Sequence, residues 1–141
     1  MSWNSNLNEK LTINQLRYWN QAPSNLGVLE KNGINFSITS SDLKNKKDFL
    51  KNIRKAIKNG LSEKTALDAL TIIPAKSLNL ENKIGKIDRG YLSNFLITSG
   101  PIFDDKTEIN ENWIKGQRHI IKNTDNINID GEYNLTINNK P

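Results

Sequence analysis

The feature that most constrains the fold is a single strand pattern placed between helical patterns. In the segment INFSIT, residues 34–39, apolar Ile34, Phe36 and Ile38 alternate with small polar residues, which is the period-two signature of a β-strand. One strand cannot form a sheet, because a central strand needs hydrogen-bonding partners on both edges. We therefore expect the chain to be the C-terminal end of something larger, with a self-contained small α+β domain as the alternative. The polar side of the strand suits a barrel interior and solvent equally.

Helical patterns lie on both sides of this strand. Before it, Thr12 and Gln15 have capping-box spacing for a short helix, and Ser24 is placed to cap a further single turn. After it, residues 45–60 form the clearest helix, with an apolar arc of Phe49, Leu50, Ile53, Ala56 and Ile57. Ser62 predicts the start of the next helix, which Pro74 interrupts.

Basic residues gather opposite that apolar arc. They are Lys47, Lys51, Arg54, Lys55 and Lys58, in a chain of net charge +5. Such a face could meet phosphates, but opposite an apolar stripe it is usually only solvated, and no aromatic residues interleave for stacking on bases. We expect no nucleic-acid partner. No apolar run approaches the ~20 residues of a membrane-spanning helix, so we also expect no membrane partner. The chain contains no cysteine, which excludes disulfides and thiolate sites.

From residue 81 onward the patterns are those of short strands. A hairpin is predicted around Lys115 and Gly116, and another around Asp130 and Gly131. The organisation that we expect has three parts. Residues 1–80 hold the strand and helices, residues 81–122 hold short strands, and residues 123–141 begin a further β-hairpin or a tail.

Several of these features resemble the closing segment of the metal-dependent amidohydrolases, especially the imidazolonepropionase-like and dihydroorotase-like members. The resemblance covers about residues 33–121, and its motifs are mostly turn glycines, helix stops and core positions. The matching positions are Thr71, Pro74 and Ala75 in a Thr-x-x-Pro-Ala turn, Gly85, Ile87 and Gly90 in a Gly-x-Ile-x-x-Gly hairpin, residues 93–97 as an apolar strand, and residues 113–117 as a hairpin.

The resemblance implies an α/β fold: the C-terminal fragment of a TIM-type (β/α)₈ barrel, followed by short strands of a small β-sandwich. Residues 34–39 would be the last barrel strand and residues 45–60 its covering helix. It also implies a hydrolase of carbon–nitrogen bonds other than peptide bonds. Such enzymes act on small amide-type substrates with zinc or another divalent metal, and their catalytic centre lies at the carboxyl ends of the strands.

Asp42 is the candidate catalytic residue that the resemblance implies. In the family an Asp at the end of the last barrel strand takes the proton from the attacking water. Alignment of Phe36 and Ile38 places that position on Ser41, so Asp42 lies one residue late, and one residue reverses the direction of a strand side chain. Either a turn returns Asp42 to the site, or Ser41 has replaced the carboxylate.

The metal ligands of the family are not matched in this sequence. Its single histidine, His119, falls in an expected strand, and we interpret it as a surface or structural residue. This chain alone is therefore expected to bind no catalytic metal, to be inactive, and to associate with itself through exposed edges. Two alternatives stay open: a catalytically degenerate amidohydrolase-fold protein used for binding or scaffolding, and a small basic nucleic-acid-binding module.

Overall fold

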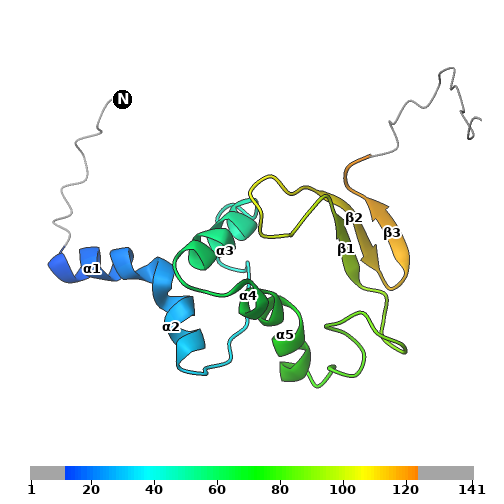
Figure 1. The fold of residues 1–141 in the computed structure, drawn as a ribbon, viewed down its shortest axis with the longest axis horizontal. Helices are drawn as coiled ribbons and strands as arrows, with labels where there is room; N and C mark the ends of the chain where they lie inside the picture. Colours follow the sequence, from blue (N-terminus) through cyan, green and yellow to red (C-terminus); the bar gives the residue numbers. More distant parts are fainter. Residues whose placement is uncertain (1–11, 124–141) are drawn as a thin grey trace, which may run out of the picture.

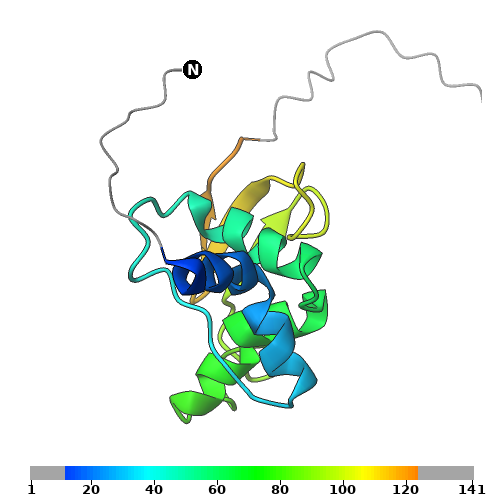
Figure 2. The same ribbon diagram turned by 90° about the vertical axis from the view of Figure 1, so that its left-hand side faces the viewer.

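The computed structural model describes residues 12–123. Helices occupy the first part of this range and a small antiparallel sheet the second (Figure 1). The helix α1 projects from one end of the molecule, and the sheet lies at the opposite end. Figure 2 shows α1 end-on, with the other helices gathered behind and below it.

The first helices begin as the capping pattern predicts. In α1 (Ile13–Gln21) the Thr12 hydroxyl accepts a hydrogen bond from the Gln15 amide at 3.2 Å, and the Gln15 side chain accepts one from the Thr12 amide at 2.8 Å. The capping box is thus confirmed. A 3₁₀ turn, η1 (Ala22–Ser24), leads into α2 (Asn25–Lys31). Ser24 does not cap α2, because its hydroxyl donates to the Gln21 carbonyl at 2.8 Å.

Three further helices enclose most of the core. They are α3 (Asp48–Lys58), α4 (Glu63–Leu70) and α5 (Ile72–Ser77). Ser62 caps α4 as predicted, its hydroxyl accepting from the Thr65 amide at 3.1 Å. The main core cluster consists of Ile53, Ala56, Leu61, Ala66 and Phe103. The predicted apolar arc of α3 therefore faces inward, and the chain after the helices adds an aromatic ring to the same core.

The sheet has three antiparallel strands in the order β1 (Phe95–Thr98), β2 (Ile109–Ile114) and β3 (Gln117–Ile120). Lys115 and Gly116 both have positive φ, 51° and 81°, which is the backbone of a tight turn between twisted strands. The predicted hairpin is confirmed. Phe95 lies opposite Trp113, and their rings stack with centroids 5.4 Å apart.

Residues 34–39 do not form a hydrogen-bonded strand within the described residues, so the predicted strand is not paired here. The segment pairs with no strand among the described residues. Two of its amides donate to helix carbonyls: Ile34 to Leu29 at 3.0 Å and Ile38 to Ala69 at 3.1 Å. Its side chains nevertheless alternate from residue 35 to residue 39, although Ile34, predicted to share the apolar side, is 52% exposed. Phe36 and Ile38 pack against the core, whereas Asn35, Ser37 and Thr39 are exposed. The physical reason is that a two-residue alternation determines which side chains can be buried, whereas a β-strand also requires hydrogen-bonding partners for its backbone.

The predicted sandwich strands are present only from residue 95. Residues 81–94 form successive turns instead of a paired hairpin. Within residues 12–123 the strands make one sheet, so the structure contains helices and a small antiparallel sheet. The predicted hairpin at Asp130 and Gly131 lies outside the described residues. None of the described helices is long and apolar enough to cross a membrane.

Candidate functional site

Asp42 lies in a tight turn that follows the 34–39 segment. The Leu43 amide donates to the Ser40 carbonyl at 3.2 Å, which closes the turn around Ser41 and Asp42. The Asp42 side chain is exposed, and its carboxylate has no hydrogen bond or ion pair with another described residue. The structure therefore places Asp42 at the end of the predicted strand, in solvent.

Local contacts hold Ser41 and the backbone beside it. The Ser41 amide donates to the Thr39 hydroxyl at 3.2 Å, an arrangement typical of serine and threonine turns. The Lys46 ammonium donates to the carbonyls of Ser40 and Ser41, the latter at 3.1 Å. The Lys46 ammonium thus holds the turn through two of its backbone carbonyl groups. It contains no base–nucleophile pair.

The described residues do not fit a catalytic metal centre. No group of three or more His, Cys, Asp or Glu side chains within residues 12–123 lies close enough together to hold an ion, whereas catalytic zinc takes three protein ligands. His119 lies on β3, where it is exposed and paired with Asn112. The structure does not bring it to Asp42.

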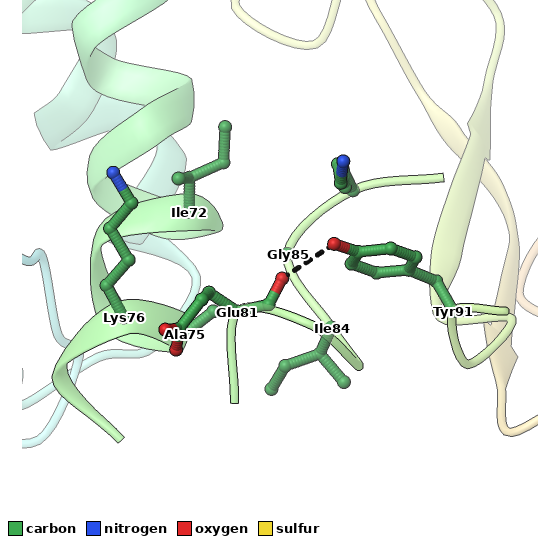
Figure 3. Close-up of a pocket in the computed structure, with 8 residues that line it drawn as sticks. Ile72, Ala75, Lys76, Glu81, Ile84, Gly85 and Tyr91 are labelled. Atoms are coloured by element: carbon green, nitrogen blue, oxygen red, sulfur yellow. Dashed lines mark hydrogen bonds between the residues drawn. The ribbon is translucent and has the colours of Figure 1, made fainter. Parts of the chain in front are cut away.

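A shallow pocket of about 300 Å³ lies between α5 and the turns that follow it (Figure 3). None of its lining residues belongs to the Asp42 turn; they are Ile72, Ala75, Lys76, Glu81, Ile84, Gly85, Lys86 and Tyr91. Gly85 has φ +98°, and a Cβ there would meet Ala75 Cβ and the Thr71 carbonyl oxygen, each at 3.0 Å. The family-like glycine thus permits a close approach between α5 and the turn.

Polar contacts stiffen the rim of this pocket. The Tyr91 hydroxyl donates to the Glu81 carbonyl at 2.8 Å (Figure 3). The Lys86 ammonium lies 2.9 Å from an Asp88 carboxylate oxygen and 4.7 Å from the Tyr91 ring centroid. Hydrogen bonding to Asp88 raises the pKa of Lys86, and the same bond lowers the pKa of Asp88. Both groups stay charged around neutral pH. The pocket therefore marks where α5 packs against the turns that follow it. Its lining residues do not include a nucleophile beside a base.

Arg54 does not belong to a solvated basic face, so that part of the prediction was wrong. Its side chain is only 15% exposed and donates from Nε to the Phe103 carbonyl and from Nη2 to the Ile102 carbonyl, both at 3.1 Å. The neighbouring Lys58 pairs with Asp105 at 2.7 Å. These contacts bind the β1–β2 loop to α3. The sequence around Arg54 carries no local signal of a partner some 50 residues away.

Glu30 is a second residue that sequence patterns did not single out. Its carboxylate accepts hydrogen bonds from the Ser62 amide at 2.8 Å, the Ser62 hydroxyl at 2.5 Å and the Thr65 hydroxyl at 2.7 Å. These bonds, led by the Ser62 hydroxyl, lower the pKa of Glu30. The charge lies at the positive end of α4, where it is favourable. Glu30 therefore joins α2 to the first turn of α4.

Two comparisons with known proteins point to the same family. The model of the amidohydrolase family matches residues 21–131. A solved structure, that of an amidohydrolase from Thermotoga maritima MSB8, superposes with a TM-score of 0.62 at 27% sequence identity. The superposition covers 68% of this chain and 25% of the Thermotoga chain. Curated proteins gave no match.

The family match extends over most of the chain and includes every helix from α2 onward and all three strands. The solved amidohydrolase supports the same assignment through the arrangement of these elements in space. This chain belongs to the amidohydrolase family.

Proposed function

We propose that the chain is the C-terminal part of a hydrolase that acts on carbon–nitrogen bonds other than peptide bonds, and that it is inactive alone. The observation that carries the proposal is the family match over residues 21–131, together with the finding that the chain spans 25% of the length of the Thermotoga amidohydrolase. The remaining length of such a protein is where a metal centre and a binding site for a small amide-type substrate would be found.

In this proposal residues 34–39 are the last strand of a (β/α)₈ barrel and α3 is its covering helix. The sheet of β1 to β3 is part of a β-sandwich. The inward packing of Phe36 and Ile38 against the helices supports the first assignment, since a barrel strand buries its apolar side chains against its outer helices. The antiparallel order of the three strands supports the second.

Asp42 is the catalytic carboxylate of the assembled enzyme in this proposal. It follows the carboxyl end of residues 34–39, which is the end at which barrel enzymes place their catalytic groups. Its exposure leaves both carboxylate oxygens available to a water molecule or a substrate. Divalent metal, which amidohydrolases generally use, would be held by residues outside the described part, because the described residues do not supply a ligand set.

The test compares two samples. One is the purified chain alone, and the other is the chain co-expressed with the polypeptide that would complete the enzyme. Elemental analysis and hydrolysis of cyclic amides such as dihydroorotate and imidazolones are measured on each sample. We expect neither stoichiometric zinc nor turnover from the chain alone, and both from the assembled protein. In that protein Asp42→Asn should lower kcat by about 10²–10⁴-fold, the usual contribution of a general base, whereas Asp104→Asn, an exposed matched control, should not.

A degenerate, non-catalytic relative is the second candidate. The observation that favours it is the Ser41–Asp42 offset, with Asp42 in an exposed turn and Ser41 held by Thr39. An assembled protein that contains no metal and hydrolyses none of these substrates would support this candidate and contradict the first.

A further inference from the structure

The sequence Lys-Asn-Gly occurs twice in this chain, and each copy ends a helix. Residues 31–33 close α2 and are followed by Ile34, and residues 58–60 close α3 and are followed by Leu61. The sequence contains no other Asn–Gly step. An asparagine side chain is especially open to attack by the next backbone nitrogen when glycine follows, because glycine has no Cβ to hinder the approach. The chain therefore presents one reactive group in two structural settings.

The two helix ends have the same backbone geometry. Gly33 and Gly60 have positive φ, 68° and 106°, and their amides donate to the carbonyls three residues earlier at 2.9 Å and 3.1 Å. The amide after each glycine donates to the carbonyl five residues before it, at 3.0 Å and 3.2 Å, which completes a Schellman motif. The side-chain amides of Asn32 and Asn59 donate to the carbonyls four residues earlier, at 2.8 Å and 2.7 Å. Local contacts therefore do not distinguish the two sites.

Packing against the rest of the molecule does distinguish them. Leu61 is 3% exposed and belongs to the main core cluster, and the Gly60 backbone lies so close to α2 that a Cβ on Gly27 would meet its carbonyl carbon at 2.7 Å. Ile34, in the equivalent position after α2, is 52% exposed, and a Cβ on Gly33 would have no described atom within 4 Å beyond its chain neighbours. A segment with few buried contacts opens more often than one anchored in the core. The end of α2 therefore opens more readily than the end of α3.

We propose that Asn32 is a site of spontaneous deamidation, and that the packing of Leu61 protects Asn59 from the same reaction. When the end of α2 opens, the Gly33 nitrogen attacks the side-chain carbonyl carbon of Asn32. A C–N bond forms, the bond from that carbon to Nδ2 breaks, and ammonia leaves with the proton of the Gly33 amide. Water then adds to either carbonyl carbon of the cyclic imide and breaks its bond to nitrogen, which gives aspartate or isoaspartate.

The product alters the connection between α2 and the segment that leads to Asp42. A carboxylate at residue 32 adds a negative charge at the C-terminal end of α2, where the helix dipole is already negative. In the isoaspartate form the backbone runs through the former side chain and gains a methylene group. The Ile34 amide then no longer meets the Leu29 carbonyl in the same geometry. Deamidation thus weakens the hydrogen bond that holds the start of residues 34–39 on the helix.

The test follows deamidation at both sites in the full chain. Samples are incubated in mildly alkaline buffer with and without urea, and the peptides that contain residues 32 and 59 are quantified by mass spectrometry. In urea we expect equal rates, because Lys-Asn-Gly precedes an aliphatic residue at both sites. In the folded chain Asn32 should react at least about ten times faster than Asn59, because only its helix end opens readily.

Two substitutions isolate the role of packing. Leu61→Ala removes the buried side chain after the second site and should raise the rate at Asn59 toward that at Asn32. Ile34→Ala, the matched change at an exposed position, should leave the rate at Asn32 unchanged. If the alanine variant at residue 61 does not unfold cooperatively in urea, Leu61→Val provides the same comparison with a smaller expected increase.

Three results would overturn the proposal. Equal rates at the two sites in the folded chain, or a faster reaction at Asn59, would show that the core does not protect the second site. Folded Leu61 variants with an unchanged rate at Asn59 would show that its protection has another source. An unreacted Asn32 in the folded chain, over a time in which both sites react in urea, would show that the end of α2 stays closed.

Discussion

At the residue scale, Glu30 makes stability depend on pH. Its pKa is lowered in the folded chain by hydrogen bonds from Ser62 and Thr65. A carboxyl group with a lowered folded pKa adds stability above its unfolded pKa of about 4.3, and that stability is lost as the pH falls through the lower folded value. We therefore expect the wild-type chain to lose stability below about pH 5, and Glu30→Gln to lose less of it.

Urea denaturation measures this difference at several pH values from about 3 to about 7, the range over which carboxyl groups titrate. The pKa values of Asp88, Asp105 and Glu111 are also lowered, so both proteins should weaken in acid. The contribution of Glu30 is the divergence between the two curves. Parallel curves for wild type and Glu30→Gln would show that the Ser62 contact does not stabilise the charged form.

Gly27 is a residue whose substitution should cost stability despite improving helix propensity. In the middle of α2 an alanine would ordinarily be favoured over glycine by roughly 0.5–1 kcal/mol. Here the added Cβ would lie 2.7 Å from the Gly60 carbonyl carbon and oxygen, and these backbone atoms cannot swing away. We expect Gly27→Ala to destabilise the chain by about 1–3 kcal/mol in urea denaturation.

Val28→Ala is the matched control for this prediction. Val28 is 52% exposed on the same helix, so its truncation removes little buried surface and should change stability by less than about 0.5 kcal/mol. A Gly27→Ala protein as stable as wild type would contradict this prediction, because it would mean that α2 and the turn at Gly60 can move apart without lowering the free energy of unfolding.

At the scale of elements, Arg54 determines whether the helices and the sheet behave as one unit. Its guanidinium donates to the Ile102 and Phe103 carbonyls, and Phe103 is only 8% exposed in the core. Arg54→Met keeps the apolar stem but leaves both carbonyls without this donor. We expect a loss of about 1.5–3 kcal/mol, the usual range for hydrogen bonds to charged groups. Amide exchange in residues 100–107 should accelerate at the same time.

Lys55→Met provides the comparison on the same helix, because Lys55 is exposed and should tolerate the change. If both variants were equally stable and exchanged equally slowly in the loop, the Arg54 contacts would be incidental to the joint between helix and sheet.

The same elements show what local sequence could predict. The caps at Thr12 and Ser62 and the hairpin at Lys115 and Gly116 follow from interactions within about four residues, so patterns of that length suffice. The inward face of α3 followed from the 3.6-residue period, with Ile53 and Ala56 buried. For the segment 34–39 the pattern predicted correctly that Phe36 and Ile38 turn inward, but not that Ile34 is 52% exposed.

What local patterns could not predict are the contacts between distant segments. Whether residues 34–39 pair depends on strands from elsewhere, and the role of Arg54 depends on a loop some 50 residues later. Glu30 and Ser62 are likewise 32 residues apart. The candidate site has the same character: Asp42 could be placed at the end of the segment, but the groups that would complete its chemistry are not set by neighbouring residues.

At the scale of the whole molecule, the sheet presents unpaired edges. In the order β1-β2-β3, the outer strands β1 and β3 each have a free edge among the described residues, and Ile97 on β1 is 40% exposed. Free apolar edges favour pairing between copies, which natural proteins often suppress with a lysine. We therefore expect the isolated chain to associate reversibly as its concentration rises, and Ile97→Lys to shift this association to at least about tenfold higher concentration.

Sedimentation velocity at several concentrations measures this association, with Leu78→Lys as the control. Leu78 is 65% exposed at the end of α5, away from the sheet, so both variants add one positive charge but only one adds it to an edge strand. The net charge of +5 opposes association, and salt should therefore strengthen it by screening that repulsion. Equal effects of the two lysines would indicate that net charge, and not the β1 edge, controls how copies of this chain meet.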